Sequence, residues 1–293
     1  MQNDNVEKVG VIGLGIIGSR IAGVLRESGR QVYVWSRTPR PEPNFLSSPE
    51  EMAEMADCIQ IFVSNGEALV ETVEAMKGSL SKRHLIINNC TADPDSVVEA
   101  YEIANEADAT FLDAPFTGSR EAAGKGALVY YVGGDPAALD LARPILEASS
   151  KEILYVGRVG EATVLKLATN MISASTVEVL SEALGLVTAA GIEPTKLGEA
   201  ISLNACGSPL TEMKLPTMIE ENYETHFSLK HMFKDAQYAL SLGKRLGIEM
   251  PTMSTTASVM FRTMQKGHGE ADYSVLAAKY QEKPEGNPAT SSK

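Results

Sequence analysis

The chain has 293 residues, of which 44% are hydrophobic and 22% are charged, a composition typical of a soluble globular protein with one to three domains. Its formal net charge of -12 opposes binding to nucleic acid or to an anionic membrane. The N-terminus lacks the apolar core of a signal peptide, no apolar run approaches the length of a membrane span, and the cysteines and histidines show no metal-ligand spacing, so we expect a cytoplasmic protein without a bound metal.

The first predicted element is an apolar strand that begins at Val9 and runs into a Gly-x-Gly-x-x-Gly turn. In such a turn Gly13 makes the tight bend, Gly15 lets the backbone approach a pyrophosphate, and Gly18 lets the helix and the strand pack closely. A helix over residues 19–28 and a second strand over 31–35 follow, so the context predicts a dinucleotide site. The alternative is a glycine-rich turn in another kind of α/β domain. The predicted cofactor contacts at the turn are Gly13, Leu14, Gly15, Ile16, Ile17 and Gly18.

The second strand ends in Ser36, Arg37 and Thr38, where an NAD-binding domain usually has an aspartate or a glutamate. A guanidinium binds a 2′-phosphate with two parallel hydrogen bonds, whereas a carboxylate repels it. We therefore predict that these three residues bind NADP(H) in preference to NAD(H). The alternative is that Arg37 is a solvated loop residue.

Short apolar strands continue to alternate with helices as far as residue 156. A helix over 49–55 is predicted by Ser48 as N-cap and Pro49 at the first helical position. The alternation predicts a doubly wound parallel sheet, a Rossmann domain over residues 1–159. Three residues at the end of the third strand, Val63, Ser64 and Asn65, complete the predicted cofactor site. The further predicted strands are 58–63, 85–88, 110–113, 128–132 and 154–156.

The strand signal stops after Gly160 and helical spacing replaces it. Residues 161–190 predict one long helix, which would bridge two domains. We expect an all-helical substrate and oligomerisation domain over 160–283, a disordered tail over 284–293, and a homo-dimer or a homo-tetramer. The remaining predicted helices are 194–203, 210–219, 229–246, 251–266 and 273–281.

The long helix carries the sharpest chemical signal. Lys166 is followed by eleven uncharged residues, and Asn170 lies four residues on, on the same helix face. An ammonium and a carboxamide side by side can both donate to a carbonyl oxygen, and partial desolvation suits a lysine to general acid catalysis. The alternative is a lysine at the helix edge beside an asparagine that bonds a neighbouring helix.

Three other segments carry site chemistry. Residues 88–91 and 113–120 follow strands, at the edge where open α/β sheets place their ligands, and the second offers hydroxyl and N–H groups that could hold a carboxylate. Residues 227–235 place Lys230 and Lys234 on one helix face beside Asp235. The alternatives are that Thr91 is a helix N-cap, that Asp-Ala-Pro at 113–115 only forms a loop, and that the lysines form a solvated face.

Together these segments resemble the β-hydroxyacid dehydrogenase family, with the closest likeness to its glyoxylate/succinic semialdehyde reductases. Four motifs match in order: the glycine turn, Asp-Ala-Pro-Phe-Thr-Gly at 113–118, Gly-Glu-Ala-Thr-Val-Leu-Lys-Leu-Ala-Thr-Asn at 160–170, and Lys-Asp at 234–235. The resemblance implies a catalytic Lys166 assisted by Asn170. It also implies that substrate is bound by Thr117, Gly118, Ser119, Thr91, Phe227 and Asp235, and that Thr91 and Lys234 touch the cofactor.

The implied activity is reduction of a small aldehyde acid by NADPH, with a carboxylate-bearing aldehyde or hydroxyacid as the small-molecule partner. The loop at 116–120 departs from the family's usual Val-Ser-Gly-Gly, because Phe116 and Arg120 change the size and charge near the pocket. The alternatives are a 3-hydroxyisobutyrate or related β-hydroxyacid dehydrogenase and, from another class, a non-catalytic NADPH-binding regulator. Imine reduction is disfavoured because such relatives replace the lysine.

Overall fold

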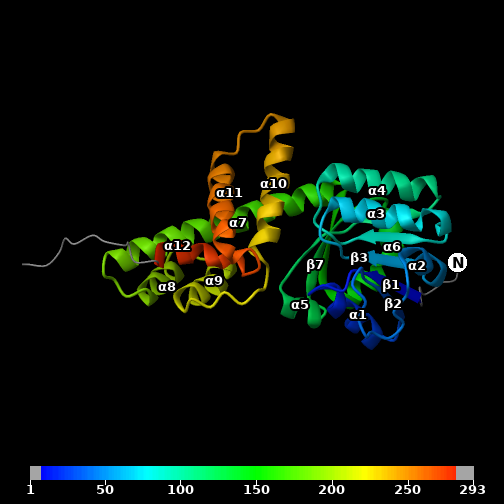
Figure 1. Ribbon diagram of the computed structural model, residues 1–293, viewed down its shortest axis with the longest axis horizontal. Coiled ribbons are helices and arrows are strands. Elements are labelled where there is room, and N and C mark those ends of the chain that lie inside the picture. Colours follow the sequence, from blue (N-terminus) through cyan, green and yellow to red (C-terminus); the bar gives the residue numbers. More distant parts are fainter. Residues whose placement is uncertain (1–7, 282–293) are drawn as a thin grey trace, which may run out of the picture. The chain divides into compact units, whose positions relative to one another are not determined.

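The computed structural model describes residues 8–281 and divides into two compact units, Met1–Ala168 and Thr169–Lys293 (Figure 1). The division falls inside helix α7 (Glu161–Ala189), nine residues after the predicted domain boundary at 159/160. The tail predicted to be disordered, residues 284–293, lies outside the described residues.

The first unit contains the predicted strands, and it also contains a short strand at Phe116–Thr117 and a short helix at Arg120–Gly124 that were not predicted. The largest difference in bounds is at the last strand, which was predicted over 154–156 and begins at Ser150. Its strands are β1 (Lys8–Ile12), β2 (Gln31–Trp35), β3 (Cys58–Ile61), β4 (Leu85–Asn88), β5 (Thr110–Asp113), β6 (Phe116–Thr117), β7 (Leu128–Gly133) and β8 (Ser150–Gly157). Its helices are α1 (Gly18–Glu27), α2 (Pro49–Met55), α3 (Gly66–Met76), α4 (Pro94–Glu106), α5 (Arg120–Gly124) and α6 (Pro136–Leu146), with short 3-10 turns η1 (Lys77–Ser79) and η2 (Glu147–Ser149).

The sheet has the order β2-β1-β3-β4-β5-β7-β6, with β8 beside β7. The first five strands are parallel, as predicted, but β7 runs antiparallel to both β5 and β6. The prediction of a doubly wound parallel sheet is confirmed for β1 to β5 and is wrong for the direction of β7. The reason is the short connection through α5, which returns the chain as a hairpin, whereas α6 provides a full crossover and makes β8 parallel to β7.

Two apolar cores fill the two faces of this sheet. Helices α1, α5 and α6 cover one face, where Ile21, Leu25 and Leu139 are buried against the strands. Helices α2, α3 and α4 cover the other, with Met52 and Leu69 among the buried side chains. Because both faces are covered, the unit is doubly wound, and the carboxyl ends of β1, β3, β4 and β5 meet at one edge of the sheet.

The second unit is helical, as predicted. In its core, one face of α7 packs against buried apolar side chains from residues 215–218, 229–236, 253–260 and 273–277. The helices α10 and α11 lie side by side (Figure 1). Its elements after α7 are α8 (Thr195–Ser202), α9 (Pro209–Ile219), α10 (Leu229–Leu246), α11 (Pro251–Thr263), the π-helical turn η3 (Met264–His268), the 3-10 turn η4 (Tyr273–Ala277) and α12 (Ala278–Gln281).

Within residues 8–281, α7 is the one helix that is long and apolar enough to cross a membrane, which corrects the expectation that no such run exists. The sequence hides this because short polar side chains interrupt the apolar ones. One face of this helix packs into the helical core of the second unit. Ala174, Val177 and Leu184 are buried in the helical core, and the buried Glu178 accepts a hydrogen bond from the Tyr280 hydroxyl at 2.8 Å.

Candidate active site

The glycine turn after β1 has the geometry that its sequence predicts. Gly13 adopts a φ of +95°, and a side chain there would collide with the carbonyl oxygen of Phe62. A side chain at Gly18 would collide with the carbonyl oxygen of Gly13, so this glycine allows the helix to pack closely on the strand. At Gly15, in contrast, an added Cβ would meet no atom within 4 Å. The backbone at Gly15 is therefore open to an approaching ligand, as a pyrophosphate requires.

The N-terminus of α1 lacks a side-chain cap and has no acidic residue in its first turn. The next five helices of the unit, α2 to α6, each begin at a residue whose side chain accepts a backbone N–H: Ser48, Asn65, Asp93, Ser119 and Asp135. The N–H groups and the positive dipole end of α1 are thus left for an anion. This arrangement fits the phosphates of a dinucleotide.

The ribose end of the predicted cofactor site follows β2. The Ser36 hydroxyl donates to the carbonyl oxygen of Thr38 at 2.7 Å, which fixes the turn, and the Arg37 side chain is exposed. The first carboxylate along the chain after β2, Glu42, is held by Arg26 at 3.0 Å. The turn therefore offers a cation and hydroxyls, which fit a 2′-phosphate.

Residues Val63, Ser64 and Asn65 follow β3, next along the same sheet edge. The Asn65 side chain accepts from the N–H of Ala68 and caps α3, and Ser64 is exposed. The role of Asn65 in shaping this loop is therefore clear, and contact of the three residues with cofactor stays a prediction.

The segment after β4 is held from within the sheet. Asn88 and Asn89 are buried, and the Asn89 amide donates to the carbonyl oxygen of Ala114 at 2.8 Å. The Thr91 alternative, a helix N-cap, is wrong, because α4 is capped by Asp93, which accepts from the N–H of Ser96 at 2.9 Å. Cys90 is buried and forms no disulfide. Thr91 thus remains a candidate for binding.

The segment after β5 contains the predicted carboxylate loop. Thr117 ends β6, Gly118 has a φ of +140°, and Ser119 caps α5 by accepting from the N–H of Ala122 at 3.1 Å. A hydroxyl that accepts one bond can still donate its own proton. The loop therefore offers hydroxyl and N–H donors, which suit a carboxylate, and this role stays a prediction.

Asp113, at the start of this loop, was not among the predicted site residues. Its buried carboxylate accepts from the N–H groups of Gly160 and Thr163, from the Thr163 hydroxyl and from the Asn88 amide. Burial raises the pKa of Asp113 to about 6, although these four hydrogen bonds act to lower it. The available signal was its place at a strand end before Ala-Pro, inside a family motif.

Lys166 lies in the second turn of α7 and is 9% exposed. The expectation that it does not face open water is confirmed. A lysine with so little exposure is uncommon unless it has a structural partner or a chemical task.

Two predicted residues of the second unit are brought together with a third. The Asn170 amide donates to Asp235 Oδ2 at 2.7 Å, and the Lys234 ammonium lies 3.0 Å from Asp235 Oδ1. Asn170 and Asp235 are buried, so the cluster is protected from water. Phe227 stacks on His231, with ring centroids 6.3 Å apart. The alternative of a solvated lysine face holds only for Lys230, which pairs with the exposed Glu270.

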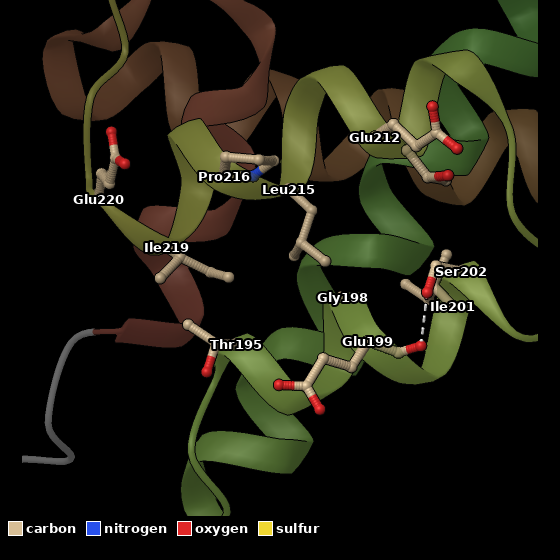
Figure 2. Close-up of a pocket in the computed structure, with 11 residues that line it drawn as sticks. Thr195, Gly198, Glu199, Ile201, Ser202, Glu212, Leu215, Pro216, Ile219 and Glu220 are labelled. Atoms are coloured by element: carbon tan, nitrogen blue, oxygen red, sulfur yellow. Dashed lines mark hydrogen bonds between the residues drawn. The ribbon is translucent and has the colours of Figure 1, made fainter.

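A hollow of about 350 Å³ between α8 and α9 contains none of the predicted site residues (Figure 2). Apolar side chains, among them Leu215 and Ile219, line it with the carboxylates of Glu199, Glu212 and Glu220. An anionic substrate would be repelled there. Within residues 8–281, no group of three or more His, Cys, Asp or Glu side chains could hold a metal ion.

The glycine turn on a doubly wound sheet, joined to a helical unit with a buried polar cluster, fits a dinucleotide-dependent oxidoreductase. A family model described as the NAD-binding domain of 6-phosphogluconate dehydrogenase matches residues 8–157. A second, described as NAD-binding of NADP-dependent 3-hydroxyisobutyrate dehydrogenase, matches residues 160–280. Both models describe dinucleotide binding, and the second names NADP, which supports NADP(H) as the cofactor.

Two curated relatives from Arabidopsis thaliana are named glyoxylate/succinic semialdehyde reductase 2, chloroplastic, and glyoxylate/succinic semialdehyde reductase 1. They are 30% and 28% identical over 92% of this chain, and the matches cover 78% and 96% of the relatives. The structure of Mycobacterium tuberculosis 3-hydroxyisobutyrate dehydrogenase with L-serine matches 94% of this chain and 99% of its own, with a TM-score of 0.85 at 22% identity. The chain belongs to the β-hydroxyacid dehydrogenase family, and it is an NAD(P)-dependent oxidoreductase that acts on CH–OH groups.

Proposed function

We propose that this protein uses NADPH to reduce a small aldehyde acid to the hydroxyacid, with glyoxylate and succinic semialdehyde as the first candidate substrates. The observation that carries the proposal is Lys166, a nearly buried ammonium in a helix whose first turn is tied to the sheet edge by Asp113. The names of the Arabidopsis thaliana relatives support the substrate class.

In the proposed reaction, NADPH when bound supplies the hydride that the carbonyl carbon receives. The hydroxyl and N–H groups of residues 117–119 hold the substrate carboxylate. Lys166 stabilises the developing alkoxide with its charge and then transfers a proton to that oxygen, so the aldehyde becomes an alcohol. Asn170 donates one N–H to Asp235, which fixes its amide, and the second N–H orients the substrate oxygen.

The preference for NADPH is assigned to Arg37, with Ser36 and Thr38 beside it. A guanidinium at the end of β2 binds the 2′-phosphate that NADH lacks, whereas no carboxylate is placed there to accept from the ribose hydroxyls of NADH.

Two rival functions differ in what Lys166 does. Oxidation of 3-hydroxyisobutyrate or a related β-hydroxyacid would use the same lysine as a base, and this reaction is the runner-up. A non-catalytic NADPH-binding regulator would need neither a buried lysine nor the Asn170–Asp235 pair, so the burial of Lys166 and Asn170 favours an enzyme.

The test is loss of NADPH absorbance with glyoxylate, succinic semialdehyde and methylmalonate semialdehyde in parallel, repeated with NADH, and NADP⁺ reduction with 3-hydroxyisobutyrate. We expect fast turnover of the first two aldehydes with NADPH. Turnover confined to 3-hydroxyisobutyrate would replace the proposal with the runner-up. Tight NADPH binding without turnover of any of these would favour the regulator.

We also propose a cytoplasmic homo-oligomer. Cys58, Cys90 and Cys206 form no disulfide within residues 8–281, as in a reducing compartment, and fractionation of the source cells tests the location. Ile172, Val179 and Leu186 lie at seven-residue spacing on α7 and are each more than half exposed, a stripe that a second copy of the helix could cover. Light scattering should report a dimer or a tetramer, and Leu186→Glu should lower the mass. A monomeric wild type would contradict this proposal.

A further inference from the structure

The Asp113 carboxylate connects three segments of the first unit. Its Oδ2 accepts from the N–H groups of Gly160 at 3.1 Å and Thr163 at 2.9 Å. Its Oδ1 accepts from the Thr163 hydroxyl at 2.8 Å and from the Asn88 amide at 3.2 Å. The side chains of Asp113, Asn88 and Thr163 are all fully buried. One side chain thus holds the end of β4, the end of β5 and the first turn of α7.

Each of these three segments leads directly to a predicted site residue. Asn88 also accepts from the N–H of Cys90 at 3.0 Å, next to Thr91. Asp113 begins the loop that contains residues 117–119. Thr163 lies three residues before Lys166, so one helical turn separates the anchored residue from the lysine. A shift of the α7 N-terminus would therefore move Lys166 directly.

The charge of Asp113 suits this place in the fold. Its carboxylate lies at the N-terminus of α7, where a helix favours negative charge, and both of its backbone donors belong to that helix end. Gly160, with a φ of +88°, brings its N–H to the carboxylate in a conformation that residues with side chains rarely adopt. The Asp113 carboxylate and the conformation of Gly160 therefore both contribute to holding the first turn of α7.

We propose that Asp113 is a positioning residue, which sets the place of Lys166 relative to residues 88–91 and 117–119 by holding the first turn of α7. This inference rests on the proposed function, in which Lys166 donates the proton. Asp113 does not touch the substrate in this role. It acts through Lys166, so its effect on catalysis should disappear when Lys166 is absent.

The test is a double-mutant cycle of Asp113→Asn and Lys166→Ala. An asparagine can still accept from the two backbone N–H groups through its oxygen, but its NH₂ then meets the Asn88 amide, donor against donor. Asp113→Asn alone should lower kcat by roughly 10- to 100-fold, because a displacement near one ångström is enough for such a loss, with the Kd for NADPH little changed. In the Lys166→Ala background the same substitution should have no further effect on kcat.

Two further variants separate positioning from folding. Asn88→Asp with Asp113→Asn restores the hydrogen bond between the two side chains and should recover part of kcat. Asp135→Asn removes the carboxylate that caps α6 in the same unit and should leave kcat unchanged. Equal losses of kcat from Asp113→Asn with and without Lys166 would overturn the proposal, as would a loss of stability with kcat intact.

A readout that needs no substrate distinguishes this inference from the proposed function. The rate at which an amine reagent labels Lys166, followed by peptide mass spectrometry, should change in Asp113→Asn and stay unchanged in Asp135→Asn. If no aldehyde acid is turned over, a changed labelling rate retains Asp113 as the residue that positions Lys166 and rejects only the substrate. An unchanged labelling rate rejects the positioning role.

Discussion

Each of the two units contains a buried aspartate that accepts hydrogen bonds from backbone N–H groups, but only one of the two aspartates has a counter-ion. In the first unit, Asp113 receives its hydrogen bonds from neutral donors only, and burial raises its pKa to about 6. In the second unit, Asp272 accepts from the N–H groups of His226, Phe227 and Ser274, and it also binds the Lys214 ammonium at 2.6 Å. Burial raises the pKa of Asp272 as well, but Lys214 and the hydrogen bonds outweigh it and the pKa is lowered.

The difference shows what a counter-ion changes. An aspartate without a counter-ion keeps its charge at a cost, which its hydrogen bonds from neutral donors offset only in part. An aspartate with a counter-ion forms a strong local ion pair, as Asp272 does with Lys214. The second arrangement fixes the loop before α10, which carries Phe227.

The largest expected effect comes from removing the ion pair between Lys214 and Asp272 in the second unit. Lys214→Met leaves the Asp272 charge buried without its counter-ion, and we expect a loss of about 3–5 kcal/mol in the free energy of unfolding. Urea denaturation measures it. The matched control is Lys196→Met, which removes an exposed pair with Glu199 at 2.7 Å and should cost about 1 kcal/mol or less. Equal losses for the two variants would contradict the account.

The next effect is a pH dependence of stability that has opposite signs for Asp113 and Asp272. The pKa of Asp113 is raised from 3.8 to about 6, so the stability that protonation gives the folded state is present below pH 3.8 and is lost as pH rises to about 6. The stability of Asp113→Asn relative to wild type should therefore improve across that window, by at most about 1.4 kcal/mol per pH unit.

For Asp272, whose pKa is lowered, the stabilising effect is present above pH 3.8 and is lost as pH falls further. The stability of Asp272→Asn relative to wild type should improve as pH falls. Denaturation series at several pH values measure both trends, and trends of the same sign would show that the two aspartates are not in different electrostatic environments.

The smallest effect concerns the cofactor. Arg37→Ala should raise the KM for NADPH by about tenfold, since a hydrogen bond to a charged group contributes about 1.5 kcal/mol or more, and should leave the KM for NADH unchanged. Arg40→Ala, three residues further on, is the control. A parallel rise for both cofactors would remove Arg37 from 2′-phosphate recognition.

Local signals predicted most of the fold. The strand over 31–35 and the helix over 49–55 have the predicted bounds, because an apolar run and a Ser-Pro start are read from neighbouring residues. The direction of β7 was missed because it depends on pairing with β5 and β6, and the apolar run over 128–132 is the same for either direction.

Local features of the candidate site that belong to continuous motifs were predictable from the sequence, and contacts between distant residues were not. Lys166 and the glycine turn belong to local motifs. The role of Asp113 depends on Gly160 and Thr163, which lie 47 and 50 residues further along the chain. Asn170 and Asp235, 65 residues apart, were both predicted, but nothing in the sequence indicated that they bond each other.

The most direct test of the central claim is the single-turnover rate of NADPH oxidation with glyoxylate and succinic semialdehyde, for wild type and Lys166→Ala at saturating NADPH. We expect a rate lower by about 10²–10⁴-fold in the variant, the usual contribution of a general acid, with NADPH binding retained. A variant rate within about threefold of wild type would show that Lys166 does not deliver the proton.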